Sequence, residues 1–209
     1  MRKEDFKLLK NIFGAYSKID LRYSFAQIDF DNKKITVADS KRVIVFYLRD
    51  EEIKNCKGVF YTHSKILSLL STFTAKDYDY SFKDNCLVVK GVSIGLDNLP
   101  KGEEFEYPDV DDVIKKHTKD IAKQSPDFKV DTLIDIEFEL PKKNVYINTD
   151  DLAIFQEHKC YNYNVYIKPQ EDNDPSVVKI EGFVKDEYDD VVKRYDAVIM
   201  GVIHNIEQD

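Results

Sequence analysis

Apolar residues recur along the chain with two spacings, every three or four positions in some stretches and every second position in others. The first spacing is typical of helices and the second of strands. A helix is predicted over Glu4–Ser17, where Phe6, Leu9, Phe13 and Tyr16 form one apolar stripe. Runs rich in β-branched and aromatic residues follow it and predict antiparallel strands. These strands are expected at Leu21–Phe30, Lys34–Ala38, Arg42–Leu48 and Gly58–Tyr61.

The pattern then repeats as a short helix and further strands. Thr62 or Ser64 can cap the helix, and Ile66, Leu69 and Leu70 face inward. Three more strands are expected at Tyr78–Phe82, Cys86–Lys90 and Val92–Leu96. The stretch Asn98–Tyr107 contains Pro, Gly and an acidic cluster, which favours a linker.

The second half begins with a predicted helix at Asp109–Gln124, whose first turn is acidic as the helix dipole prefers. A short acidic helix is expected at Asp150–Glu157. The strands predicted around these helices are Thr132–Leu140, Val145–Ile147, Tyr163–Lys168, Val177–Val184 and Tyr195–His204. The last of these is almost continuously apolar, so we expect it inside a sheet.

The helix-and-strand unit at Tyr61–Gly91 has a weaker copy at Ile147–Gly182. Two copies at this separation suggest two similar domains, since a solenoid needs several shorter repeats. We therefore predict an α+β fold of two similar domains, each with antiparallel sheets and two helices on one face. The expected limits are residues 1–98 for the first domain, 99–108 for the linker and 109–209 for the second.

Composition supports a globular intracellular protein. The 209 residues are 43% hydrophobic and 33% charged, with a formal net charge of -8. Three distant cysteines argue against a disulfide scaffold and a structural zinc site, and no stretch has the length of a signal peptide or membrane span. The acidic balance leaves room for a local basic surface that binds nucleic acid.

Motifs for catalysis are weak. Asp29 with Asp39-Ser40-Lys41 resembles the metal-binding hairpin of a nuclease, but the spacing is loose and Asp39-Ser40 is also explained as a turn. The histidines are scattered, and phosphate-binding and serine-hydrolase motifs are absent from the sequence. We therefore expect a protein that is not an enzyme and that needs no metal or cofactor.

Two short phrases resemble DNA sliding clamps. Tyr107-Pro108-Asp109-Val110 is similar to the aromatic-Pro-Asp segment that precedes the last domain of bacterial clamps. The run from Ala197 to Val202 resembles their apolar C-terminal strand, with Gly201 in the place of a proline. The arrangement of two domains with two helices each also resembles a clamp subunit.

The resemblance implies a DNA polymerase processivity factor. Such subunits close head-to-tail into a ring around duplex DNA, and they bind a polymerase and a clamp loader through short peptides. Two-domain subunits of the eukaryotic, archaeal and phage types close as trimers, so a homotrimer is the favoured assembly, with a bacterial cytoplasm as its place if a phage encodes it. A binding or scaffold protein of unrelated α+β fold and the metal nuclease are the alternatives.

A sliding ring attracts phosphates without gripping bases, which lysines on the helices lining its hole would achieve. Lysine also decorates many solvated helices. The lysines that the resemblance assigns to the DNA-facing surface are Lys3, Lys7, Lys10, Lys65, Lys76, Lys116, Lys119 and Lys123. Against this assignment, the predicted fourth helix is acidic, with Asp151 at the position of Lys65 in the repeat.

The resemblance also implies an apolar groove for partner peptides, near the linker and the C-terminal strand. Met200 and Val202 match the phrase that lines this groove in bacterial clamps, and Leu99 and Pro100 in the linker are further candidates. For Met200, an ordinary core position is the alternative.

Overall fold

The protein forms two compact units, which we describe separately. The computed structural model describes residues 3–14, 24–63, 66–73, 80–97, 107, 109–118, 122–128, 162–168, 175–185 and 191–201. The first unit comprises Met1–Ser40 and Ile44–Val110, and the second comprises Lys41–Val43 and Asp111–Asp209. Apart from Tyr107, the predicted linker 99–108 lies outside the described residues, and the domain limits stay a prediction.

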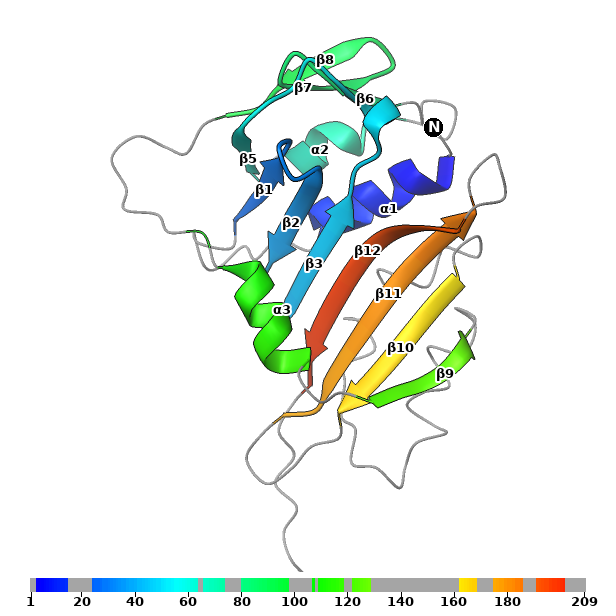
Figure 1. Ribbon diagram of the computed structural model, residues 1–209. Helices are drawn as coiled ribbons and strands as arrows, with labels where there is room; N and C mark the ends of the chain where they lie inside the picture. Colours follow the sequence, from blue (N-terminus) through cyan, green and yellow to red (C-terminus); the bar gives the residue numbers. More distant parts are fainter. Residues whose placement is uncertain are drawn as a thin grey trace, which may run out of the picture. The chain divides into compact units, whose positions relative to one another are not determined.

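The first unit combines two sheets with two helices (Figure 1). Its elements are α1 (Lys3–Gly14), β1 (Phe25–Asp29), β2 (Lys34–Ala38), β3 (Arg42–Tyr47), the 3-10 helix η2 (Asp50–Glu52), β4 (Ile53–Lys54), β5 (Val59–His63), α2 (Ile66–Leu70), β6 (Tyr80–Lys83), β7 (Cys86–Val89) and β8 (Val92–Gly95). Strands β5, β1, β2 and β3 are neighbours in one sheet, and β4, β6, β7 and β8 form the other.

Pairing in the first unit is antiparallel with a single short exception among the described strands. Gln27 of β1 lies opposite Thr36 of β2 and Tyr61 of β5, which fixes the register of three strands. A bridge between Tyr61 and Asp97 links the two sheets. The exception is the two-residue strand β4, which runs parallel to β6.

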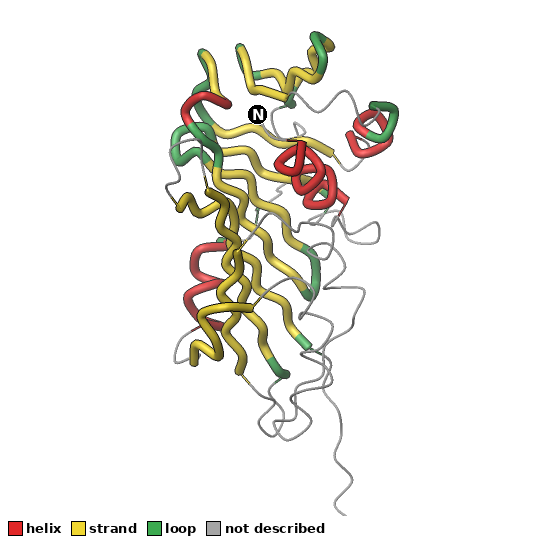
Figure 2. Tube along the Cα trace, turned by 90° about the vertical axis from the view of Figure 1, so that its right-hand side faces the viewer, coloured by secondary structure: helices red, strands yellow, loops and turns green. Residues whose placement is uncertain are grey.

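The core of the first unit lies between the helices and one sheet face (Figure 2). The apolar stripe of α1 buries Phe6, Leu9, Ile12 and Phe13 completely. Phe6 packs against Tyr80, with ring centroids 5.8 Å apart. Each such side chain contributes roughly 1.5–3 kcal/mol when removed from water, so this stripe determines that the segment is a helix docked on the sheet.

The second unit is built on one antiparallel sheet with the strand order β12-β11-β10-β9. Its elements are α3 (Val110–Thr118), β9 (Ala122–Phe128), β10 (Asn162–Lys168), β11 (Val177–Lys185) and β12 (Val191–Met200). Helix α3 starts at Val110, the last residue of the first unit. A bulge separates the Gly182–Tyr195 pair from the Phe183–Lys193 pair, and the Tyr195 ring covers Gly182 so closely that a Cβ there would overlap it.

The predicted α+β fold of antiparallel sheets with few helices is confirmed. The third helix was predicted too long, because it ends at Thr118 and Ala122–Phe128 is a strand. Pro126 has no amide hydrogen, and it disfavours helical geometry in the residue before it, so sheet pairing with β10 prevails there. Proline is tolerated at a sheet edge, where β9 lies in this strand order.

Other boundaries differ by a few residues. Strand β12 begins at Val191, before the predicted Tyr195, and η2 and β4 were not predicted. The first copy of the repeat contains α2, β6 and β7 as expected. Predictions that fall outside the described residues are the strands Thr132–Leu140 and Val145–Ile147 and the helix Asp150–Glu157. Among the described residues, no helix has the length and apolar character needed to cross a membrane.

Candidate nucleic-acid interface

Helix α1 is amphipathic and carries Lys10 beside its buried stripe. Lys10 is half-buried, and its ammonium lies 6.0 Å from the centroid of the Phe6 ring. A cation over an aromatic face gains about 0.5–1 kcal/mol at such a site. The Lys10 side chain therefore lies beside the Phe6 ring, and its contact with phosphate stays a prediction.

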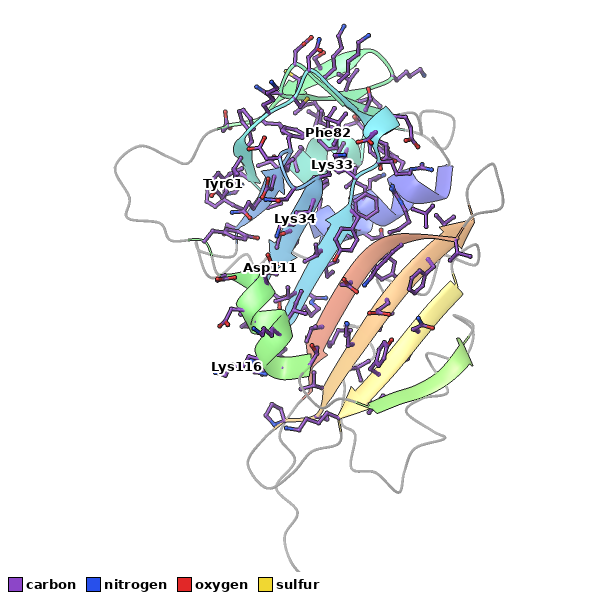
Figure 3. The ribbon with its side chains drawn as sticks, in the orientation of Figure 1. Lys33, Lys34, Tyr61, Phe82, Asp111 and Lys116 are labelled. Carbon is purple, nitrogen blue, oxygen red and sulfur yellow. The ribbon has the colours of Figure 1, made fainter. Side chains whose placement is uncertain are left out.

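Most of the other predicted DNA-facing lysines have side chains that lie outside the described part of the structure. The backbones of Lys3 and Lys7 lie in α1, but their side chains are outside the described part, as are Lys65, Lys76 and Lys119 altogether. Lys116 is exposed on α3, and Figure 3 shows it projecting away from the strands. Lys10 and Lys116 belong to different units, and the assignment of these lysines to one DNA-facing surface stays a prediction.

Lys123 requires a correction. The sequence placed it on the third helix, whereas it lies in strand β9, opposite Tyr166 of β10. The argument that Lys116, Lys119 and Lys123 share one helical face therefore fails for Lys123. The sequence signal for a strand here was Pro126, two residues after the predicted helix end, because it favours extended geometry at Ser125.

Met200, the described member of the predicted peptide groove, ends β12 and is half-buried. Its amide donates a hydrogen bond to the carbonyl of Lys41 at 2.8 Å, and the amide of Gly201 donates to Ser176 at 2.7 Å. Figures 1 and 2 place α3 beside this end of β12. Leu99, Pro100 and Val202 lie outside the described residues.

Tyr107 fastens the end of the linker to the first unit. Its hydroxyl donates a hydrogen bond to the carbonyl of Thr36 at 2.9 Å, and its ring centroid lies 5.9 Å from that of Tyr61. Gln27 in turn donates to the Tyr61 hydroxyl at 3.2 Å. Burial raises the pKa of the Tyr107 phenol well above its usual value. The resemblance singled out this tyrosine, but not its role as an anchor.

A polar network that the sequence did not reveal crosses three strands of the second unit. Glu181 of β11 accepts hydrogen bonds from Tyr166 at 3.1 Å and Asn164 at 3.4 Å. Its other oxygen lies 2.9 Å from the Lys179 ammonium and 3.3 Å from that of Lys193. The signal was present as polar residues at alternate positions of these strands, but alternation alone indicates only an outward face.

The charges around Glu181 change its titration. Desolvation opposes ionisation, but the hydrogen bond and charge of Lys179, helped by Lys193 and Asn164, lower the pKa of Glu181 to about 2. For Lys193, desolvation is outweighed by Asp196, 2.7 Å away, and by Glu181, so its pKa is raised. Glu181 and Lys193 are therefore both ionised at neutral pH and compensate each other's charge.

The nuclease hairpin receives no support from the site geometry. Both oxygens of Asp29 accept hydrogen bonds from Asn32, one from its amide at 2.9 Å and one from its side chain at 2.7 Å. Asp29 thus closes the turn between β1 and β2. Within the described ranges, no group of three His, Cys, Asp or Glu residues is arranged to hold a metal ion.

Comparison with solved structures identifies proteins of similar fold. Over 97% of its length, the chain is similar to the beta subunit from DNA polymerase of Streptococcus pyogenes, with a TM-score of 0.52 and 9% identity. It also resembles Helicobacter pylori beta clamps, one bound to a DNA ligase peptide, at 14% identity over 99% of the chain (TM-score 0.46), and one in complex with a difluorobenzamide, at 10% identity over 95% (TM-score 0.49).

These likenesses show a sliding-clamp fold, and the argument rests on the streptococcal structure, whose TM-score exceeds 0.5. The chain spans 63% of the length of that subunit, and 65% and 64% of the two Helicobacter chains. No family model matches the chain, and no curated protein matches it by sequence.

Proposed function

We propose that the chain is a subunit of a DNA sliding clamp, a processivity factor that encircles duplex DNA and tethers a polymerase. The observation that carries the proposal is the fold, which is similar over nearly the whole chain to a subunit of a DNA polymerase. Such a factor holds its partners in place and catalyses no reaction.

The proposed ring is a homotrimer of two-domain subunits. The chain spans 63% of the length of the streptococcal subunit. Subunits of two domains close as trimers in the eukaryotic, archaeal and phage clamps that the arrangement resembles. The lysines of α1, with Lys65 and Lys76, are the proposed phosphate contacts of the first unit, and Lys116 and Lys119 those of the second.

The proposed partners are a DNA polymerase and a clamp loader, which bind through short peptides near Met200, Val202, Leu99 and Pro100. Met200 is half-buried at the end of β12, and its flexible thioether is of a kind that adapts to different apolar ligands. Bacterial cytoplasm is the proposed compartment, because the polymerase acts there.

Charge reversal tests the DNA-facing lysines. Lys7→Glu with Lys10→Glu should reduce stimulation of a cognate polymerase on primed circular DNA at least tenfold, because it replaces two phosphate contacts by repulsion. A parallel pair, Lys116→Glu with Lys119→Glu, tests the second unit on its own. Unchanged stimulation by either folded variant would remove that pair from the proposed interface.

A further inference from the structure

Three exposed lysines meet at one corner of the smaller sheet of the first unit. Strand β4 runs parallel to β6, and Lys54 is the register partner of Lys83. Neighbouring strands lie about 4.8 Å apart, so these two side chains leave one face of the sheet side by side. Like charges placed opposite each other repel, and a bound anion would remove that repulsion.

Hydrogen bonds between two turns hold this corner in place. The amide of Asp84 donates to the carbonyl of Lys54 at 3.0 Å, and the Asn55 side chain donates to Asp84 at 3.3 Å. The amide of Lys57 donates to the Asn85 side chain at 3.2 Å. Asn55, Asp84 and Asn85 all adopt positive φ, a conformation that Asn and Asp tolerate better than most residues.

The acidic side chains of the preceding helix η2 are engaged elsewhere. Asp50 pairs with Lys33 at 2.6 Å, and Glu51 pairs with Arg49 at 3.1 Å. Glu52 is fully buried and also pairs with Arg49. The carboxylate closest in sequence to Lys83, that of Asp84, accepts from Asn55. A hydrogen bond from a neutral amide does not cancel a carboxylate's charge, so Asp84 and also Asp31, which accepts from the Gly58 amide at 3.0 Å, belong to the surroundings of the corner. The lysine corner, defined as Lys54, Lys57 and Lys83, thus sets three lysines against two carboxylates and is a local basic surface on an acidic protein.

The residues beside the corner decide what kind of anion fits. Lys83 is in register with Cys86 and Gly95, and the next row on the same face contains Ser81, the half-buried Val88 and Ser93. These small side chains provide neither the large apolar pocket that anchors a peptide nor an aromatic platform for a base. Flexible ammonium groups over a flat surface suit charges that repeat along a polymer, without readout of sequence.

We propose that the lysine corner binds the phosphodiester backbone of nucleic acid, at a surface separate from the helices that would line a clamp. This contact requires neither ring closure nor a polymerase. It would give the protein a weak affinity for linear DNA, with a steep dependence on salt because each neutralised phosphate releases counterions.

The test is the binding of a short, labelled, linear duplex measured by fluorescence anisotropy at several salt concentrations. In the triple variant Lys54→Gln, Lys57→Gln, Lys83→Gln, affinity at low salt should fall about tenfold or more. The slope of log K against log salt should become shallower by about 2 to 3, one phosphate for each lysine. A charge-matched control, Lys34→Gln, Lys41→Gln, Lys90→Gln, should leave the slope within about one of the parent value.

Two results would overturn the proposal. An unchanged slope and affinity in the folded triple variant would show that the corner does not contact phosphates. If the triple variant lost binding to a poly-glutamate peptide but kept its DNA binding, the corner would be assigned to an acidic protein partner. The result is separable from the proposed function, since the charge-reversed α1 variants test polymerase stimulation on circular DNA and keep the corner intact.

Discussion

Among the described residues, Glu52 of the first unit and Glu181 of the second are both shielded from solvent, but they are held in different ways. In the first unit, Glu52 is fully buried, and its carboxylate accepts from the amide of Arg49 at 2.9 Å, from the Arg49 guanidinium at 3.2 Å and from the Tyr80 hydroxyl at 3.3 Å. Except for Tyr80, these partners lie three residues away. The carboxylate thus fixes a turn and ties it to β6.

In the second unit, Glu181 has a side chain that is 13% exposed, and its partners come from three different strands. Its ion pairs with Lys179 and Lys193 cross the face of the sheet. A local carboxylate determines how one turn is folded, whereas a cross-strand carboxylate determines how strands are aligned. The two units should therefore respond differently to substitution and to acid.

Loss of the Glu52 carboxylate should have the largest effect. Glu52→Ala leaves Arg49 and Tyr80 without their buried acceptor, and we expect the free energy of unfolding to fall by about 3 kcal/mol. Urea denaturation of the purified protein measures this change. Glu51→Ala is the matched control, because Glu51 also contacts Arg49 but is 62% exposed, so its effect should stay near 0.5 kcal/mol. Equal effects would contradict the role assigned to burial.

The second largest loss of stability is expected from crowding at the bulge of the second unit. Gly182→Ala would place a methyl group against the Tyr195 ring, and we expect a loss of about 1–3 kcal/mol in the same assay. Gly95→Ala, where the added methyl would meet open space, should change stability by about 0.5 kcal/mol at most. A neutral Gly182→Ala would mean that the ring moves aside, and that the bulge is not fixed by this contact.

Acid should affect the stability of the second unit through Glu181. Because its pKa in the folded protein is lowered from 4.5 to about 2, its ionised form stabilises the fold above about pH 4.5. That contribution, about 1–2 kcal/mol after allowance for solvent screening, should disappear as the pH falls from 4.5 to 2. The stability difference between the parent protein and Glu181→Gln, measured by urea at several pH values, should shrink over that window. A difference independent of pH would contradict the ion-pair account.

The smallest effect is expected at the linker anchor. Tyr107→Phe removes the hydrogen bond to Thr36 while keeping the contact with Tyr61, so stability should fall by about 1 kcal/mol. Limited proteolysis followed by mass spectrometry should show faster cleavage within residues 98–108. Tyr61→Phe, which loses a bond from Gln27 alone, is the control and should leave cleavage unchanged.

The sequence predicted those parts of the fold in which periodicity and burial coincide. The spacing of Phe6, Leu9 and Phe13 predicted α1, because a helix with one apolar stripe has one stable way to dock on a sheet. The strands β2, β3 and β7 were placed to within a residue or two for a similar reason. The third helix was overextended, because a polar periodic segment carries little information on where sheet pairing takes over, as at Lys123 in β9.

The candidate sites were less predictable, because they depend on residues brought together by register. Lys54 and Lys83 are far apart in sequence, and their pairing follows from the short parallel strand β4, which composition did not indicate. The partners of Glu181 likewise depend on the register of three strands. Met200 was singled out through resemblance, and its half-buried position is compatible with both a groove and a core edge.

The central claim, that the chain forms a ring that slides on DNA, is tested most directly by retention on DNA of defined topology. The protein is loaded on nicked circular DNA, separated from free protein by gel filtration at high salt, and the DNA is then cut with a restriction enzyme. A sliding clamp should stay with the circular DNA and be released when the DNA is linearised. The released protein should have a native mass of three subunits. Release from the circle at high salt, or equal retention on linear DNA, would contradict the claim.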